Sequence, residues 1–170
     1  MNGTGGPPDF ESYVASRRAQ LRRTAYLLCG DWDRAEDIVQ DTLTRLYVHW
    51  RRASSADSVD AYVRRSLVNA YLSEGRRPWR RERPTEVLPE TEVGDATGRI
   101  VAEDEVQAAL RRLPRRQRAV VVLRYFDDLS EAETARLLGI STGTVKSQTS
   151  KALAALRVDE GLDRARTEVG

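Results

Sequence analysis

The chain has 170 residues, of which 40% are hydrophobic and 32% charged, and its formal net charge at pH 7 is +2. This length suits one large domain or two small ones. Cys29 and His49 are the single cysteine and the single histidine, which excludes a disulfide framework, a cysteine zinc site and histidine-based catalysis. No apolar run approaches the roughly 20 residues that span a membrane. The N-terminus also lacks a signal-peptide pattern, so we expect no membrane insertion and a cytoplasmic protein.

Basic and acidic residues are concentrated in different segments. Residues 76–84 hold five basic and one acidic side chain, residues 85–109 one basic and seven acidic, and residues 110–158 ten basic and four acidic. Arginine supplies 26 of the 28 basic residues, so guanidinium groups would make most phosphate contacts. The order basic, acidic, basic predicts two modules that face nucleic acid, separated by an acidic connector.

Two amphipathic helices are predicted after residues 1–8, a Gly/Pro-rich segment that we expect to be a disordered tail. The first runs from Asp9 to about Leu28 and the second from Arg34 to about Trp50, with Asp33 as the expected cap of the second.

The second helix carries a dense acidic patch. The patch lies opposite the apolar arc of the helix, and Tyr47 belongs to that arc. From spacing alone, this patch is a solvated face, a docking surface for a basic partner or a metal site. A metal site would need ligands that converge from another element, and no second acidic helix is evident. The polar arc consists of Glu36, Asp37, Gln40, Asp41 and Thr44.

A third helix is predicted from Ala61 to Arg76, after a polar loop over residues 51–60. Its polar stripe contains no acid and consists of Arg65, Asn69, Ser73 and Arg76. The stripe leads into Arg77 and Trp79, where arginines flank a tryptophan and can stack on unpaired bases. Alternatively, Trp79 packs on the domain and the arginines face solvent.

Prolines, glycines and acidic residues mark a linker after the third helix. We therefore divide the chain into a first module at 9–83, a flexible acidic linker at 84–99, a second module at 100–158 and a tail at 159–170. The second module begins with predicted helices at 100–113 and 114–126. Val120, Val121, Leu123 and Tyr125 form the expected buried side of the second of these helices.

The segment Ser130 to Leu156 has the pattern of a helix-turn-helix. Ser130 and Glu133 form a capping box, Gly139 suits a left-handed residue after the helix, and Ser141 can cap the second helix. The outer side of that second helix is small, hydroxylated and cationic, with no carboxylate before Asp159. Such a face is typical of helices that lie on phosphates and base edges. The alternative is a helical hairpin with a solvated face.

The whole pattern predicts an all-α protein of two small helical domains, and it resembles the extracytoplasmic-function (ECF) group of bacterial RNA polymerase sigma factors, in the sigma-70 superfamily. The resemblance rests on DRAEDIVQDTLTRLY at 33–47, AYVRRSLVNAYLSEGRR at 61–77 and LPRRQRAVVVLRYFDDLSEAETARLLGISTGTVKSQTSKAL at 113–153. These motifs occur in the family's order and at its spacing, and they cover nearly the whole chain after residue 9.

The resemblance implies a promoter-specificity subunit without catalytic residues, metal or cofactor. Its implied partners are core RNA polymerase, through the β′ clamp helices and the β flap, promoter DNA, and an anti-sigma factor. The acidic linker would lie in the RNA path of the polymerase. Polymerase-binding positions are Glu36, Asp37, Gln40 and Asp41; minus-10 positions are Arg65, Asn69, Ser73, Arg76, Arg77 and Trp79; minus-35 positions are Thr142, Thr144, Lys146, Ser147, Gln148, Ser150 and Lys151.

The recognition helix departs from the family pattern at Gln148, where many relatives have an arginine, and at Ser150, where a bulkier residue is common. We therefore expect weaker upstream-element contacts or a different sequence preference.

Two other function classes compete with the sigma-factor hypothesis. One is an autonomous helix-turn-helix repressor or activator, with residues 1–80 as a sensor or dimerisation domain. The other is an enzyme that uses Asp37 and Asp41, for which the sequence offers neither a pocket nor partner residues.

Overall fold

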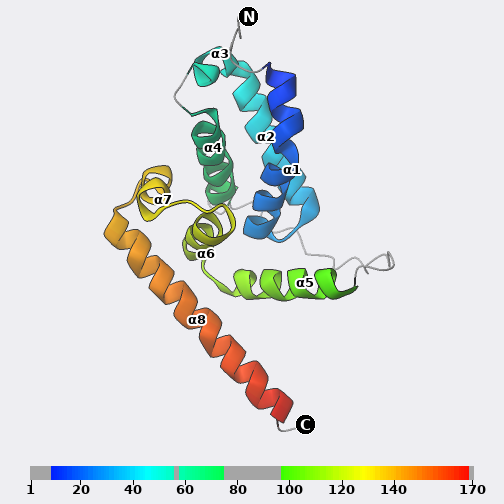
Figure 1. Ribbon diagram of the computed structural model, residues 1–170, viewed down its shortest axis with the longest axis vertical. Coiled ribbons are helices and arrows are strands. Elements are labelled where there is room, and N and C mark those ends of the chain that lie inside the picture. Colours follow the sequence, from blue (N-terminus) through cyan, green and yellow to red (C-terminus); the bar gives the residue numbers. More distant parts are fainter. Residues whose placement is uncertain (1–8, 56–57, 75–96, 169–170) are drawn as a thin grey trace, which may run out of the picture.

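The structure, a computed structural model, describes residues 9–55, 58–74 and 97–168 (Figure 1). Within these residues all regular secondary structure is helical, which confirms the predicted all-α class. No helix among them is long and apolar enough to cross a membrane. The predicted tail at 1–8 and most of the predicted linker lie outside the described residues. The elements are α1 Phe10–Cys29, α2 Trp32–Val48, α3 Trp50–Ser54, α4 Val59–Glu74, α5 Thr97–Arg112, α6 Arg115–Val121, the π-helical turn η2 Val122–Phe126, α7 Glu131–Leu138 and α8 Thr142–Glu168.

The N-terminal group of helices, α1–α4, is built around three long helices that lie side by side (Figure 1). Each buries an apolar stripe, with residues such as Leu28, Leu46 and Leu67 almost fully shielded from solvent. A polar clamp also joins α1 to α4. The Tyr13 hydroxyl donates to Asp60 Oδ1 at 2.8 Å, and Arg17 donates to Asp60 Oδ2 at 2.8 Å.

The connection between α1 and α2 is tight because Gly30 ends one helix and Asp31 caps the next. Gly30 has φ +75°, a left-handed conformation that glycine adopts without a Cβ clash. A Cβ atom at Gly30 would also lie 2.7 Å from Arg111 Nε and 2.8 Å from Gln107 Nε2. The Asp31 side chain accepts from the Arg34 amide at 2.9 Å. The prediction that Asp33 caps α2 is therefore wrong. Asp33 lies in the first turn of α2, where its negative charge complements the helix dipole.

Four further expectations from the sequence are corrected. The segment 51–60, expected to be a loop, includes most of the short helix α3. The segment 159–170, expected to be a tail, is helical as far as Glu168, because residues 158–168 are rich in helix formers and extend α8. Tyr47 is 65% exposed at the edge of the apolar arc of α2. Tyr125 is 50% exposed because the π-helical turn η2 rotates its side chain out of the buried side.

The helix-turn-helix of α7 and α8 has the predicted local structure. The Glu133 amide donates to Ser130 Oγ at 3.1 Å, and the Ser130 amide donates to Glu133 Oε2 at 2.8 Å. This bond from the Ser130 amide, together with the Ser130 side chain, holds the pKa of Glu133 below its ordinary value. Gly139 has φ +65°, and Ser141 Oγ accepts from the Thr144 amide at 3.1 Å. Both caps and the glycine turn are therefore confirmed.

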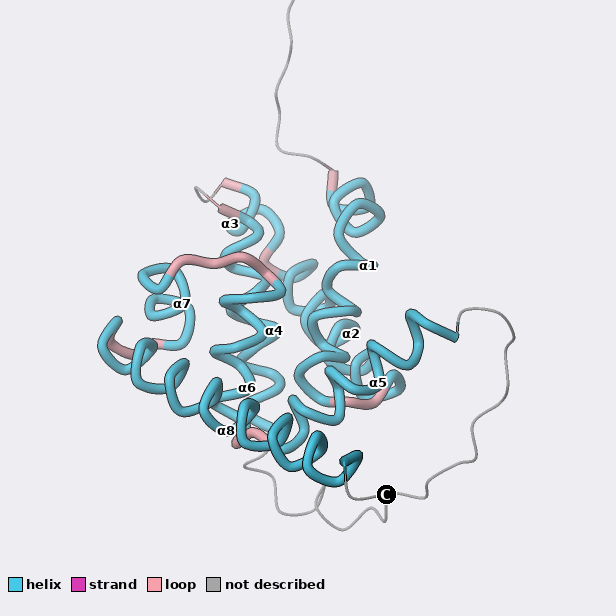
Figure 2. Tube along the Cα trace, turned by 60° about the horizontal axis from the view of Figure 1, so that its bottom comes forward, coloured by secondary structure: helices cyan, strands magenta, loops and turns pink. Residues whose placement is uncertain are grey.

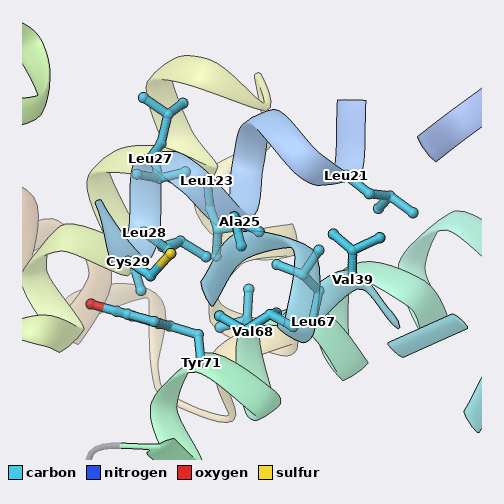
Figure 3. Packing of buried hydrophobic residues seen from close by; sticks show 14 of the residues in the cluster. Leu21, Ala25, Leu27, Leu28, Cys29, Val39, Leu67, Val68, Tyr71 and Leu123 are labelled. Atoms are coloured by element: carbon cyan, nitrogen blue, oxygen red, sulfur yellow. The ribbon is translucent and has the colours of Figure 1, made fainter. Parts of the chain in front are cut away.

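The C-terminal group of helices, α5–α8, packs directly against the N-terminal group. α1 contacts α5, α6 and η2, while α4 contacts α6 and α7 (Figure 2). One hydrophobic cluster crosses the boundary. In it, Leu123 of η2 is fully buried near Ala25 and Leu28 of α1 (Figure 3). The two predicted modules thus share a core, a contact for which the sequence offers no periodic signal.

Replacement of the helix cap by Ser130→Ala is expected to lower the free energy of unfolding by about 1 kcal/mol, because the Glu133 amide loses its side-chain acceptor. Urea unfolding followed by circular dichroism measures this change. Ser150→Ala is the matched control, since Ser150 is exposed in the middle of α8, and it should leave stability unchanged or slightly raised. Equal stability of Ser130→Ala and wild type would contradict the role of the cap.

Candidate functional site

The acidic patch of α2 is a continuous exposed surface. Asp37, Gln40 and Asp41 are all exposed, and they project from the side opposite the buried residues Ile38, Val39 and Thr42. Asp37 and Asp41 are one helical turn apart and so lie above each other on the surface. No described group of three or more His, Cys, Asp or Glu side chains is arranged to hold a metal ion. This exposed acidic face fits both a solvated surface and a docking surface for a basic partner.

Glu36 differs from its neighbours because two arginines of α1 already pair with it. Arg18 donates to Glu36 Oε1, and Arg22 Nε lies 3.2 Å from Glu36 Oε2. The Arg22 guanidinium also lies 4.8 Å from the ring centre of Trp32. Neither arginine was predicted at this surface, because the separation of both from Glu36 along the chain gives no periodic signal. Negative charge available to a partner therefore centres on Asp37 and Asp41.

The polar stripe of α4 is partly described. Arg65, Asn69 and Ser73 are exposed at intervals of four residues, so the structure brings these three predicted positions onto one face. On the other side, Val63, Leu67, Val68 and Tyr71 are buried, and they fix the rotation of the helix. The other predicted minus-10 positions, Arg76, Arg77 and Trp79, lie outside the described residues.

Another ion pair holds the end of α4 against the start of α2. Arg34 Nη2 lies 2.9 Å from Glu74 Oε2, and the Glu74 side chain is only 10% exposed. Burial lowers the pKa of Arg34, but the hydrogen bond and charge of Glu74 outweigh it and leave the pKa above its ordinary value. The pair connects the helix that carries the acidic patch to the helix that carries the polar stripe.

The outer face of α8 is exposed where the sequence predicted it. Val145 and Ala152 are fully buried and orient the helix. Opposite them lie five of the predicted minus-35 positions, all exposed: Thr142, Lys146, Ser147, Ser150 and Lys151.

The two remaining minus-35 positions, Thr144 and Gln148, are partly buried. The Thr144 hydroxyl lies 2.9 Å from Ser141 Oγ, so it helps to form the turn. Glu131 of α7 was not predicted at this surface, yet its Oε2 lies 3.8 Å from Lys146 Nζ. The Lys146 side chain is 67% exposed in this pair, and such pairs contribute little to stability. Lys146 therefore stays available to a phosphate.

Family models match both groups of helices. The model described as Sigma-70 region 2 matches residues 13–81, and the model described as Sigma-70, region 4 matches residues 103–156. The region 2 match covers the segment that the repressor hypothesis would assign to a sensor or dimerisation domain, so it disfavours that alternative.

Curated relatives and a solved structure agree with these matches. The chain is 40% identical over 149 residues to the RNA polymerase sigma-E factor of Streptomyces coelicolor, covering 88% of this chain and 84% of that protein. It is 34% identical over 148 residues to the ECF RNA polymerase sigma factor SigM of Mycobacterium tuberculosis, covering 86% and 74%. The structure of the sigma factor RpoE in complex with the anti-sigma factor NepR from Bartonella quintana has a similar fold. Its TM-score is 0.67 at 24% identity, covering 88% of this chain and 94% of that one.

Two family models in the expected order, together with relatives of this identity and coverage, settle the resemblance seen in the motifs. The chain belongs to the ECF family of RNA polymerase sigma factors.

Proposed function

We propose that this sigma factor acts in the cytoplasm, without catalysis of its own, by joining core RNA polymerase to promoters at three of its surfaces. The main support for this proposal is the distribution of acidic and basic residues over those surfaces. The polymerase-facing surface of α2 is acidic, whereas the described DNA-facing surfaces of α4 and α8 contain no carboxylate of their own. A surface that meets phosphates excludes acids because each one repels the DNA backbone.

The proposed sequence of events begins with the acidic patch of α2 on the β′ clamp helices. The C-terminal group contacts the β flap and places α8 in the major groove of the minus-35 element. The stripe of α4 then holds an unstacked base of the minus-10 element, where flipping costs a few kcal/mol per base and is offset by contacts in the pocket. Because two DNA sites are held on one scaffold, neither needs to bind tightly alone.

An anti-sigma factor is a further proposed partner. The sigma factor of similar fold from Bartonella quintana was solved in complex with the anti-sigma factor NepR. The similarity covers 88% of this chain and therefore includes both groups of helices. We propose that a protein of the anti-sigma class binds across both groups and keeps the chain from the polymerase.

Run-off transcription from a genomic DNA library, with purified core polymerase and with or without this protein, tests the function as a whole. Specific new start sites are expected only when the protein is present. Tight duplex binding by the protein alone, with no binding to core polymerase and no transcripts, would instead support an autonomous regulator.

Charge reversal by Asp37→Arg is expected to abolish co-purification with core polymerase, because it places a cation at the centre of the proposed acidic docking surface. The matched control is Glu11→Arg, an equal charge reversal at an exposed position of α1. Pull-down of polymerase by tagged variants measures the effect. If both variants retain polymerase equally, the docking assignment fails.

Truncation by Asn69→Ala is expected to reduce promoter melting about tenfold, which corresponds to the loss of about 1.4 kcal/mol of base contact. Core polymerase binding should be unchanged. Permanganate reactivity of unpaired thymines measures melting, and Ser12→Ala, an exposed polar truncation on α1, is the control. Wild-type melting by Asn69→Ala would remove this residue from the proposed pocket.

Removal of one cation by Lys146→Ala is expected to weaken DNA binding by the holoenzyme and to reduce its salt dependence by about 0.9 in the slope of log K against log salt, as one phosphate contact is lost. Arg157→Ala removes another exposed cation of α8 outside the proposed surface and should leave the slope unchanged. Titration of a promoter fragment at several salt concentrations distinguishes the two. Equal slopes for both variants would contradict the minus-35 assignment.

A further inference from the structure

One carboxylate lies beside the DNA-facing surface of α8, although it belongs to α7. Glu131 Oε2 is 3.8 Å from Lys146 Nζ, and the Glu131 side chain is 38% exposed. α7 packs against α8, and Lys146 lies near the start of α8, the part of a recognition helix that contacts base edges. Glu131 would therefore face the same duplex as Lys146.

This position has an electrostatic cost. An ammonium binds a phosphate oxygen at about 2.8 Å, so any phosphate held by Lys146 would lie no more than about 7 Å from Glu131 Oε2. That separation is shorter than the Debye length of about 8 Å at physiological salt, so dissolved ions screen the repulsion only in part. Glu131 thus opposes contact with the backbone of every DNA sequence.

The cap of α7 does not explain this acid. The Glu133 amide and the Ser130 amide already bond to the side chains of the capping box, at 3.1 and 2.8 Å. Glu133 also supplies negative charge to the first turn, where the helix dipole favours it. A second carboxylate in that turn, placed against a DNA-facing lysine, points instead to a role in the contact with DNA.

Glu131 also differs in hydrogen bonding from the exposed residues of α8 around it. Lys146 and Lys151 only donate, and phosphates and base acceptors satisfy them equally. Hydroxyls such as those of Thr142 and Ser147 donate or accept, so they discriminate weakly between bases. A carboxylate only accepts. It therefore selects a base that presents a donor.

Cytosine is the base that suits such a group. In the major groove, the donors are the N4 amino group of cytosine and the N6 amino group of adenine. The adenine amino group lies between two acceptors, its own N7 and O4 of the paired thymine, whereas the cytosine amino group has one acceptor beside it, O6 of the paired guanine. A carboxylate that accepts from cytosine is therefore repelled by fewer neighbouring acceptors.

We propose that Glu131 is a specificity-determining residue of the minus-35 surface, and that it accepts a hydrogen bond from the N4 amino group of one cytosine in this element. The Lys146 ammonium has three donors, so it can pair with Glu131 and bind a phosphate at the same time. Glu131 weakens binding to duplexes that offer it no donor and restores binding where the cytosine is present, and this difference is the specificity. The inference rests on the proposed placement of α8 in the major groove.

The test uses a promoter found by run-off transcription, with its minus-35 element randomised and selected for binding to holoenzyme made with the full-length chain. Wild type should enrich cytosine at one position, on one of the two strands. Glu131→Gln should change that preference to adenine, because a glutamine amide pairs with adenine N6 and N7. Glu131→Ala should lose the preference and gain no other. Each change should be about tenfold at that position, the discrimination of one good base contact.

Binding to a duplex without the element supplies a second readout. Both variants should bind it about threefold more tightly than wild type, because two unit charges about 7 Å apart in water repel by about that factor. Glu105→Gln removes the same charge at an exposed position of α5 and should change neither readout. A merely structural role at the start of α7 would affect base preference equally in Glu131→Gln and Glu131→Ala, so a change to adenine in the first variant alone identifies base contact.

The outcomes separate this proposal from the proposed function. A wild type that selects other bases but no cytosine, or unchanged base preferences in both Glu131 variants, would overturn base reading by Glu131, even if the variants bind all duplexes more tightly. A wild-type holoenzyme with no preference at any position of the element would overturn the proposed minus-35 contact instead.

Discussion

The ends of α1 and α4 leave backbone carbonyls without helical partners, and three arginines of α5 and α6 donate to them. This contact explains why arginine is used here. A planar guanidinium carries five donors in a fixed fork, which lets Arg118 contact the carbonyls of Leu28, Arg111 and Leu113 together. Each lysine ammonium is a compact point charge on a flexible stem and offers no such fixed geometry. The arrangement of both groups of helices depends on these shared donors and on the core around Leu123.

The same contacts change how the basic residues in the second half of the chain are interpreted. Ten basic residues between 110 and 158 suggested a surface for nucleic acid. Several of them instead face protein, while Lys146 and Lys151 of α8 stay exposed. A count of charges along the sequence cannot separate these roles, because a cation that caps a helix and a cation that faces a phosphate contribute equally to it. Only the contacts that each cation makes in the folded chain distinguish them.

The parts of the fold that sequence patterns predicted are those set by residues a few positions apart. The capping box of Ser130 and Glu133, the left-handed Gly139 and the two faces of α8 all follow from spacings of three or four residues. Asn69 and Asp37 were placed on exposed faces for the same reason. Periodicity could not reveal the pairing of Glu36 with Arg18, or of Thr24 with Asp127, because these partners are far apart in the chain. The π-helical turn that exposes Tyr125 also lacks a 3.6-residue signature.

Gly30 affects both the local backbone at the end of α1 and the packing of the two groups of helices. Its left-handed conformation ends α1, and the space beside it is occupied by Arg111 and Gln107. Any side chain there would strain the turn and would also have to displace the ends of the Arg111 and Gln107 side chains. Since Gly30 belongs to neither the acidic patch of α2 nor the proposed DNA surfaces, a substitution at this residue would disturb the packing of the two groups without changing the residues of those surfaces. The packing of the two groups and the chemistry of the proposed contact surfaces therefore depend on separate residues of one small chain.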